Sequence, residues 1–387
     1  MRILHVIESL NPDSGGPPMI AAGLAAAQAG LDCQVTLATH STPGRDEQIA
    51  QTLQSLPHFE QVHLVCMERR GPLAPYVGKG RSRLRRLVAD AQVVHVHFSW
   101  EPLPRLTAAE CRRNRCPYFV LLNGMLDPWS LAQKPWKKRL ALKFGTHRML
   151  QQAAALHLGT RTEQQLIEPL KLRAPRIILP NGVFMEELEP LPPSGSFYCE
   201  LPRLERQPYI LFMSRLHHKK GLDLLADAYA TIASQFTDTH LVVAGPDDGA
   251  GADFERRIAD HDLTRRVHLT GPIYGRRKLA ALCDCALFCL PSRQEGFSVA
   301  IVEALACAAP VVITEGCHFP QVAEAGAGMV VNADGGAVAM AMARLLGDQT
   351  LRERMGRAGR ELITTGYTWP KIAESVVAAY DRALQSR

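Results

Sequence analysis

Thirteen short apolar runs, separated by longer stretches with helical periodicity, constrain the fold of this chain more than any other feature. Seven lie in the first half, at 3–7, 34–38, 62–66, 93–97, 118–122, 155–158 and 176–179. Six lie in the second half, at 209–213, 240–244, 267–269, 286–290, 310–314 and 329–331. Continuous apolar strands that alternate with helices are typical of parallel sheets covered on both faces. Because the pattern occurs twice, we predict an α/β chain with two doubly wound, Rossmann-like domains.

A stretch rich in Pro, Gly, Ser and acidic residues, 186–207, separates the two halves and has the composition of a linker. A length of 387 residues is enough for two domains. We expect these domains over 1–190 and 191–370. The last segment, 371–387, carries Ile372, Val376, Tyr380 and Leu384 on one stripe. We expect it to form a helix that packs back on the first domain.

Composition and charge indicate the compartment and the kind of partner to expect for the protein. No apolar stretch approaches the length of a membrane span, and the first residues do not resemble a secretion signal. The cysteines mostly lie in apolar runs, where thiols pack as small hydrophobic groups, so we expect a reducing, cytoplasmic compartment. Between Glu68 and Arg148, 17 Lys or Arg face 5 Asp or Glu, a net +12 against +6 for the whole chain. Such asymmetry indicates an acidic partner surface.

The pair Gly15-Gly16 follows the first predicted strand and precedes Pro17-Pro18 and a predicted helix over 19–29. Glycines permit close backbone approach, and a helix N-terminus attracts anions. The pair lacks the spacing of a dinucleotide-binding fingerprint, so a helix-entry loop explains it equally well.

A second loop, Ser214-Arg215-Leu216-His217-His218-Lys219-Lys220-Gly221, follows the first predicted strand of the second domain. Ligands of open α/β sheets bind beyond the carboxyl ends of the strands. Arg215 and Lys220 could there hold phosphate oxygens, although a charged loop is often only solvated.

The third and most informative stretch is Ser292-Arg293-Gln294-Glu295-Gly296-Phe297-Ser298, followed within a predicted helix by Glu303. Glu295 precedes that helix, and Glu303 lies in an apolar setting where a carboxylate needs a polar partner. Two acids near a helix N-terminus suit a ligand with many hydroxyl groups, since hydroxyls donate to carboxylates.

With Glu295-Gly296-Phe297, and with seven residues between Glu295 and Glu303, the stretch resembles the signature of family 4 retaining glycosyltransferases of the GT-B fold. The loop from Arg215 to Gly221 is similar to that family too, as are Gly15-Gly16, the strand end 94–97 and Pro180-Asn181-Gly182-Val183. The stretch 124–129 resembles a subset that builds bacterial surface polysaccharides.

The resemblance implies two domains facing each other across a cleft, with the acceptor bound by the first and a nucleotide-diphosphate sugar by the second. Arg215 and Lys220 would hold the diphosphate, Glu295 the transferred sugar and Glu303 the ribose. The N–H groups of Gly296, Phe297 and Ser298 would face the sugar or phosphates, and Gly16, beside Gly15, would approach a donor phosphate. His97 would lie near the acceptor side, and Asn123 would be a further residue of the catalytic site.

Asn123 is a departure, since many relatives carry His before the glycine at 124. Asn can hydrogen-bond a hydroxyl but cannot carry a proton at neutral pH. We expect no metal and no cofactor, because the Asp260-His261-Asp262 segment suits a helix end and fixed cations can stabilise a leaving diphosphate.

The resemblance implies transfer of a hexose with retention, from a nucleotide sugar to a glycan or lipid-linked saccharide in surface-polysaccharide assembly. The alternatives are another GT-B sugar-nucleotide enzyme, such as an epimerase or phosphorylase, and a sugar-binding homologue without catalytic activity. A nicotinamide-dependent oxidoreductase would need a different glycine spacing.

Basic residues interleaved with apolar ones, at 79–87 and 134–148, favour peripheral binding to an anionic membrane, on the inner face of the cell membrane. A solvated basic face, or a groove for an acidic acceptor, is the alternative. We expect no nucleic-acid partner.

Overall fold

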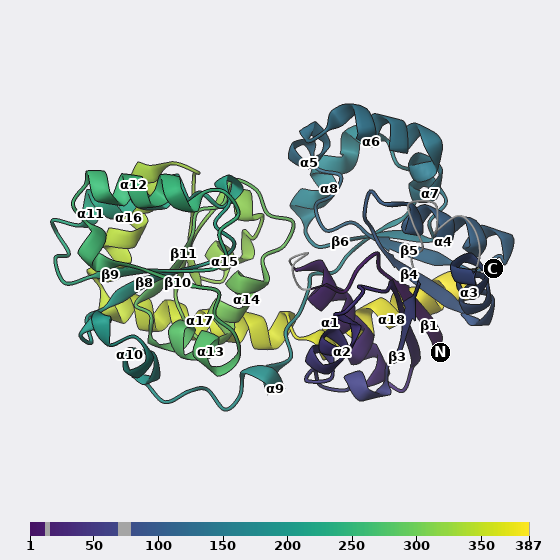
Figure 1. The fold of residues 1–387 in the computed structure, drawn as a ribbon, viewed down its shortest axis with the longest axis horizontal. Coiled ribbons are helices and arrows are strands. Elements are labelled where there is room, and N and C mark those ends of the chain that lie inside the picture. The colour runs from purple at the N-terminus through teal and green to yellow at the C-terminus, as the bar shows by residue number, and fades with distance from the viewer. Residues whose placement is uncertain (12–15, 69–78, 387) are drawn as a thin grey trace. The chain divides into compact units, whose positions relative to one another are not determined.

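The computed structural model describes residues 1–11, 16–68 and 79–386, and its chain divides into two units. Unit 1 comprises Met1–Glu187 and Thr368–Arg387, and unit 2 comprises Leu188–Tyr367. Each unit contains one parallel sheet with helices on both faces, so the prediction of two doubly wound domains is confirmed (Figure 1).

The sheet of unit 1 has seven parallel strands in the order β3-β2-β1-β4-β5-β6-β7. These strands are β1 (Arg2–Val6), β2 (Gln34–His40), β3 (His63–Met67), β4 (Val93–His97), β5 (Tyr118–Leu121), β6 (Ala155–Leu158) and β7 (Arg176–Ile178). The helices are α1 (Pro17–Ala29), α2 (Asp46–Leu53), α3 (Lys79–Asp90), α4 (Pro102–Arg113), α5 (Pro128–Ala132), α6 (Pro135–Ala141), α7 (His147–Gln151), α8 (Arg161–Ile167), α9 (Met185–Leu188, across the unit boundary) and α18 (Trp369–Gln385).

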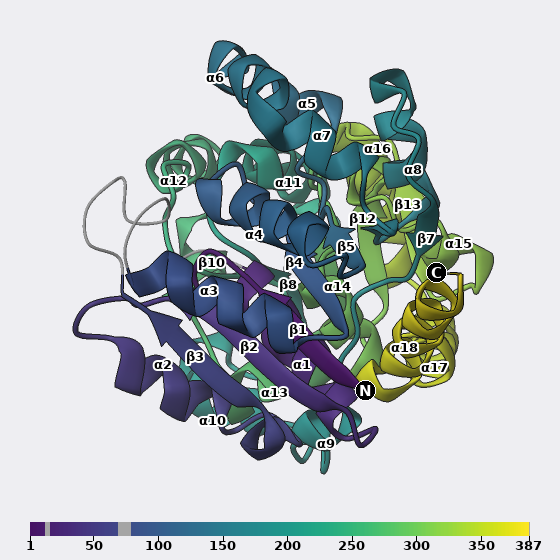
Figure 2. The same ribbon diagram turned by 90° about the vertical axis from the view of Figure 1, so that its right-hand side faces the viewer.

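Alternation along β4 assigns the two faces of this sheet. Val94 and Val96 belong to the apolar core that includes Leu84 of α3 and Leu103 of α4. Helices α3 and α4 pack together over that face (Figure 2). His95 and His97, which alternate with those valines along the strand, point to the opposite face, because successive side chains of a strand alternate.

Helix α18 packs against α1 within unit 1. Its first residue, Trp369, donates its main-chain N–H to the carbonyl of Val183 at 3.0 Å. A Cβ on Gly23 of α1 would lie 2.5 Å from the indole nitrogen of Trp369, so the missing side chain at that position admits the ring.

The sheet of unit 2 has six parallel strands in the order β10-β9-β8-β11-β12-β13. They are β8 (Tyr209–Met213), β9 (His240–Ala244), β10 (Val267–Gly271), β11 (Leu287–Leu290), β12 (Val311–Thr314) and β13 (Gly328–Val331). The helices are α10 (Ser196–Glu200), α11 (Leu222–Ile232), α12 (Gly251–Asp260), α13 (Gly275–Asp284), α14 (Val299–Ala306), α15 (Gln321–Glu324), α16 (Gly335–Leu346) and α17 (Gln349–Gly366). Figure 1 shows α11, α12 and α16 on one face and α13 and α17 on the other.

The stretch expected to be a linker is instead mostly a folded part of unit 2. Phe197 and Leu204 are fully buried, and the Phe197 ring lies 5.5 Å from that of Tyr209. The carboxylate of Asp284 accepts the main-chain N–H groups of Gly195 and Phe197 at 2.7 and 2.8 Å. The prediction of a linker rested on the Pro, Gly and Ser residues and overlooked the apolar side chains between them, such as Phe197 and Leu204.

Candidate functional site

Two loops of unit 2 bring together the charged residues that the sequence singled out. One loop follows β8 and the other follows β11, which is the neighbour of β8 in the sheet. The chain continues from β8 to β9 on one side and reaches β11 on the other, so the strand order reverses between β8 and β11. Ligands of doubly wound sheets bind at such a point, beyond the carboxyl ends of the strands.

Gly221 allows these two loops to pack closely. Its φ of +73° lies in the left-handed region, and a Cβ there would lie 2.0 Å from the carbonyl oxygen of Pro291. Any other residue would be strained and would push the loops apart.

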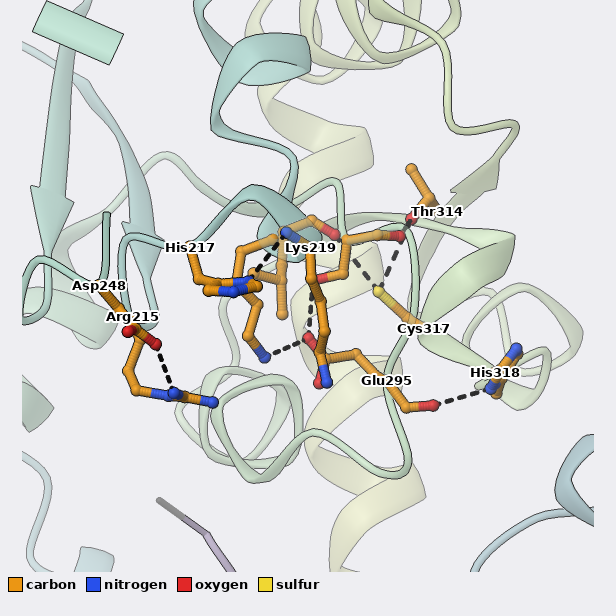
Figure 3. Close-up of polar contacts among 11 residues, drawn as sticks. Arg215, His217, Lys219, Asp248, Glu295, Thr314, Cys317 and His318 are labelled. Carbon is orange, nitrogen blue, oxygen red and sulfur yellow. Dashed lines mark hydrogen bonds and ion pairs between the residues drawn. The ribbon is translucent and has the colours of Figure 1, made fainter. Parts of the chain in front are cut away.

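Lys220 and Glu295 form a buried ion pair at the centre of the site. Figure 3 shows Glu295 among the polar contacts of the two loops. Lys220 Nζ lies 2.5 Å from Glu295 Oε1, which also accepts a hydrogen bond from the hydroxyl of Ser292 at 2.7 Å. Burial alone would raise the pKa of Glu295, but the positive charges of Lys220 and Lys219 and these hydrogen bonds outweigh it and lower that pKa. Glu295 is therefore an ionised hydrogen-bond acceptor, and the positive charge of Lys220 balances its negative charge.

Arg215 lies at the outer side of the same loop, where its side chain is 48 % exposed. Its guanidinium contacts the carboxylate of Asp248 at 2.5 Å. An exposed pair of this kind contributes little to stability. Arg215 can therefore exchange Asp248 for an anionic ligand at small cost.

Arg293, which was not predicted as a site residue from the sequence, holds the two loops together. Its guanidinium donates two hydrogen bonds to Asp223 at 2.7 and 2.6 Å, and a third to the carbonyl of His218 at 3.1 Å. Its main-chain N–H donates to the carbonyl of Lys219 at 2.8 Å. Arg293 thereby fixes the backbone beside Lys220.

Helix α14 begins directly after the Glu295 loop. Its N-cap, Ser298, makes no capping hydrogen bond with its side chain, so the side chain does not occupy the first-turn N–H groups. The Phe297 ring packs 5.4 Å from that of Phe319, and Gly296 lies between Phe297 and Glu295. The imidazole Nδ1 of His318 lies 2.8 Å from the carbonyl of Glu295, which it can hold by donating its N–H.

Glu303 lies within α14 and has the polar partner that the sequence analysis required. Its carboxylate lies 2.6 Å from Nζ of Lys278, on α13, and its side chain is 16 % exposed. The two glutamates therefore have different lysine partners, Lys220 for Glu295 and Lys278 for Glu303.

His97 of unit 1 lies in a buried cluster of four histidines with His5, His95 and His157. The His97 Nε2 atom lies 3.0 Å from Nδ1 of His5, and its own Nδ1 is buried without a protein partner among the described residues. Burial, followed by the neighbouring His5 and His157, lowers the pKa of His97 well below its usual value. Burial likewise lowers the pKa values of His5 and His157, to about 4.

Asn123 occupies a left-handed turn at the carboxyl end of β5, with φ values of +49° for Asn123 and +73° for Gly124. Its Oδ1 is buried and has no protein partner within the described part of the chain. Four other buried polar atoms without such a partner lie at the end of β4 or shortly after β4 or β7: His97 Nδ1, Ser99 Oγ, Trp100 Nε1 and Asn181 Nδ2. Buried polar groups normally have a partner, so these five indicate a surface made to bind a polar ligand or water.

Glu163, which the sequence analysis also missed, supports the Asn123 turn. Its carboxylate accepts the N–H groups of Gly124 at 2.5 Å and of Gly159 at 2.7 Å, while its side chain is almost completely buried. Burial raises the pKa of Glu163 to about 7, against these two hydrogen bonds. A capping Thr160 three residues earlier is the only local signal in the sequence.

Gly15 lies outside the described residues, whereas Gly16 is exposed at the N-terminus of α1. Gly16 has an ordinary φ of −67° and makes no side-chain cap. Among the described residues, a Cβ on Gly16 would meet only Ile20, at 3.9 Å, which is an ordinary contact. The structure therefore gives no local steric reason for a glycine at this position.

The basic segment of unit 1 forms α6 and the turn 142–146 and exposes large apolar side chains. Trp136, Leu140 and Phe144 are 66, 50 and 68 % exposed. We call them, with the exposed Lys137, Arg139 and Lys143, the α6 patch. Lys138 points elsewhere: its Nζ donates to the carbonyl of Ser130 and lies 5.1 Å from the Trp100 ring centre.

No helix in the described ranges is long and apolar enough to cross a bilayer. Across the same residues, no three or more His, Cys, Asp or Glu side chains are grouped as metal ligands. All ten cysteines are free thiols.

Comparison with known proteins identifies the family. Residues 15–182 match the model of the glycosyl transferase 4-like domain, and residues 200–362 match that of glycosyl transferases group 1. Phosphatidyl-myo-inositol mannosyltransferase of Mycobacterium leprae is 26% identical over 315 residues, which cover 79% of this chain and 78% of that protein. Alpha-maltose-1-phosphate synthase of Mycobacterium tuberculosis is 27% identical over 359 residues, covering 82% and 89%.

Among solved structures, Anabaena Alr3699/HepE in complex with UDP-glucose aligns over 100% of both chains with a TM-score of 0.78 and 17% identity, a likeness of fold. Every strand of the two sheets except β1 lies within the matched regions, and the charged loops after β8 and β11 lie in the second. The chain therefore belongs to the family 4, group 1 glycosyltransferases and has their GT-B fold.

Proposed function

We propose that this glycosyltransferase transfers a hexose, with retention of anomeric configuration, from a nucleotide-diphosphate sugar to a glycan or lipid-linked saccharide in surface-polysaccharide assembly. The observation that carries the proposal is the buried Lys220–Glu295 pair beside Arg215 at the strand-order reversal of unit 2. This arrangement offers cations for a diphosphate and a carboxylate for sugar hydroxyls on two adjacent loops.

The donor diphosphate is assigned to Arg215 and Lys220. On binding, phosphate oxygens replace Asp248 at Arg215 and share Lys220 with Glu295. The uncapped first turn of α14, with the N–H groups of Gly296, Phe297 and Ser298, adds a positive dipole end for the sugar or phosphates. Gly16, at the N-terminus of α1, is a further candidate phosphate contact. UDP-glucose in the Anabaena structure makes UDP sugars the first donors to test.

Glu295 is assigned to the hydroxyls of the transferred sugar and Glu303 to the ribose. Glu295 is ionised and almost fully buried, so its hydrogen bonds to a sugar are protected from water. Glu303 is more exposed and has Lys278 as its partner, which suits a contact that leaves the reacting bond untouched.

The reaction proceeds on one face of the sugar without a covalent enzyme intermediate. As the bond from the anomeric carbon to the phosphate oxygen breaks, negative charge develops on the diphosphate, where the fixed Arg215 and Lys220 stabilise it. The acceptor hydroxyl forms the new bond on that face, and its proton passes to the departing phosphate oxygen. No metal is required in this scheme, because the two cations perform the electrostatic role.

The acceptor is assigned to unit 1, at the carboxyl ends of β4, β5 and β7. The unpartnered polar atoms of His97, Ser99, Trp100, Asn123 and Asn181 suit a ligand with several hydroxyl groups. Asn123 contributes a hydrogen bond and no proton transfer.

The α6 patch is proposed to bind an anionic membrane from the cytoplasmic side. Exposed aromatic side chains between basic residues suit insertion at a charged interface, and each basic residue near anionic lipid is worth about 1 kcal/mol. We expect sedimentation with anionic vesicles at low salt, none with neutral vesicles, and loss of binding in a Lys137/Arg139/Lys143→Glu variant. Lys138 is left intact because it contacts Ser130. Equal sedimentation with both vesicles would contradict this proposal.

A labelled-donor assay tests the proposed transfer. Wild-type protein is incubated with labelled UDP-glucose or GDP-mannose and a membrane lipid extract, and the label is followed into nucleotide, free sugar and glycolipid. Label in a glycolipid whose NMR spectrum shows the donor's anomeric configuration supports the proposal. Epimerised donor, sugar phosphate from phosphorolysis, or tight binding without turnover would identify the alternative classes, and an inverted product would contradict retention.

A further inference from the structure

The four buried histidines of unit 1 belong to one continuous hydrogen-bonded chain that begins at His97 and ends at the main chain. In order, its members are His97, His5, Gln28, Tyr380, His95, His157 and the carbonyl oxygen of Leu179. The side chains come from β1, β4, β6, α1 and α18, so the chain is formed only when those elements are packed together.

The Leu179 end determines the direction of every hydrogen bond. A carbonyl oxygen only accepts, so His157 must donate its Nε2–H to Leu179, at 2.8 Å. A neutral imidazole has one N–H, and therefore Nδ1 of His157 accepts from Nε2–H of His95, at 3.4 Å. The Nδ1 atom of His95 must then accept the hydroxyl proton of Tyr380, which lies within hydrogen-bond distance.

The remaining hydrogen bonds, from Tyr380 to His97, have their directions fixed in the same way. Because the Tyr380 hydroxyl has donated its proton, its oxygen accepts from the side-chain NH₂ of Gln28, at 3.3 Å. The Gln28 oxygen then faces His5 and accepts its Nε2–H, at 2.7 Å. Nδ1 of His5 must in turn accept Nε2–H of His97, at 3.0 Å.

His97 is therefore left with a lone pair on Nδ1, the one imidazole nitrogen of the chain without a protein partner among the described residues. We infer that this chain fixes His97 as an Nε2–H tautomer, so that His97 Nδ1 accepts a hydrogen bond from a hydroxyl group of the ligand bound to unit 1. His97 would thus touch the ligand, and His5, Gln28, Tyr380, His95 and His157 would be positioning residues. This inference rests on the proposed function for identifying that hydroxyl group as belonging to the saccharide acceptor.

The chain makes His97 a hydrogen-bond acceptor and a poor proton carrier. All four histidines are buried, and burial is the main cause that lowers the pKa of each, so a second proton on His97 is disfavoured. A proton could leave His97 along the chain only toward the Leu179 carbonyl, which does not take one. The acceptor proton therefore goes to the departing phosphate, as proposed above, while His97 orients the hydroxyl.

The direct test is ¹⁵N NMR of the imidazole groups in protein labelled at histidine. At pH 7 the four histidines are expected as neutral Nε2–H tautomers, with the His97 signals assigned by their loss in a His97→Asn variant. An Nδ1–H tautomer or a doubly protonated His97 would overturn the inference. This measurement needs neither donor nor acceptor, so it remains valid if no transferase activity is found.

The second test breaks the chain far from its ligand end. Tyr380→Phe removes the hydroxyl that joins Gln28 to His95, and we expect mixed tautomers at His97. An even mixture should raise the KM for the acceptor about twofold, because the apparent affinity falls with the fraction of molecules in the binding tautomer. Tyr118→Phe is the matched control, since that buried hydroxyl on the same sheet donates to the Met149 carbonyl and lies outside the chain. Unchanged tautomers and KM in a folded Tyr380→Phe variant would contradict the positioning role.

Substitution of His97 itself separates its two nitrogens. Asn places an amide near the position of Nδ1, whereas Gln places it near Nε2, so His97→Asn should retain more acceptor affinity than His97→Gln. Equal loss in both variants, with the KM for the donor unchanged, would count against Nδ1 as the atom that contacts the ligand.

Discussion

The polar groups buried at the carboxyl ends of the strands are stabilised in different ways in the two sheets. In unit 2 the groups are charged and paired, as in Lys220–Glu295, and the surrounding lysines lower the pKa of the carboxyl. In unit 1 they are neutral, and burial lowers the pKa of each histidine. This difference indicates that the edge in unit 2 suits a charged ligand and the edge in unit 1 a ligand that carries hydroxyl groups.

Removing a cation from the unit 2 edge should have the largest effect on activity. We expect Lys220→Ala or Arg215→Ala to lower kcat by roughly 10²–10³, because each cation acts where charge develops. Arg256→Ala is the control, as this exposed arginine of the same unit pairs only with Asp253 among the contacts described. Steady-state kinetics with a verified donor measure the effect, and near-normal activity of Arg215→Ala would remove it from the site.

The two glutamates of unit 2 should separate kinetically. Glu295→Gln is expected to lower kcat, since its contact strengthens at the reacting sugar. Glu303→Gln is expected to raise the donor KM with little change in kcat, because a ribose contact is the same before and during the reaction. Donor-saturation curves of the two variants provide the comparison, and the reverse pattern would exchange the two roles.

Acid should destabilise unit 1 through its histidines. The pKa values of His5 and His157 are depressed to about 4 in the folded state, so the unfolded chain binds more protons between pH 6.5 and 4. Stability is therefore lost as pH falls through that range, on the order of 1 kcal/mol per pH unit for each group that titrates. Urea unfolding from pH 7.5 to 4.5 measures it, provided that the unfolding of unit 1 can be distinguished from that of unit 2. A flat profile for unit 1 would contradict buried neutral histidines.

Glu163 should show a smaller effect of the opposite sign. Its folded pKa is raised to about 7, so the folded state binds more protons above pH 4.5, and its contribution to stability falls as pH rises toward 7. In Glu163→Gln this titration is absent. We expect the stability of wild type relative to the variant to decrease from pH 5 to pH 8, as followed by urea unfolding. An unchanged difference would mean that Glu163 is not protonated in this range.

The fold followed from the sequence because each strand is a continuous apolar run, and all thirteen predicted strands are present within a few residues of their expected ends. The charged loops of unit 2 were also visible, since Arg215, Lys220, Glu295 and Glu303 lie at fixed distances from those strands. Two of their partners were not, because Asp248 and Lys278 come from other elements and pair with Arg215 and Glu303 only after folding. The pair of Arg293 with Asp223 was missed for the same reason.

The polar interior of unit 1 was even less predictable. His95 and His97 appeared as part of a buried strand, but nothing local links them to Tyr380, which lies 285 residues after His95. Glu163 lies in the first turn of α8, where acidic residues are common, but its carboxylate accepts a hydrogen bond from the main chain of Gly124. Such contacts depend on tertiary packing, on which sequence spacing gives no information.

The most direct test of the central claim, that the charged edge of unit 2 binds a nucleotide-diphosphate sugar, is a thermal-shift titration with UDP-glucose and GDP-mannose. A ligand that binds only the folded state raises the apparent melting temperature with concentration. We expect a rise in wild type and in His97→Asn with at least one donor, and its loss in Lys220→Ala. An equal rise in Lys220→Ala, or no rise with any sugar nucleotide, would contradict it.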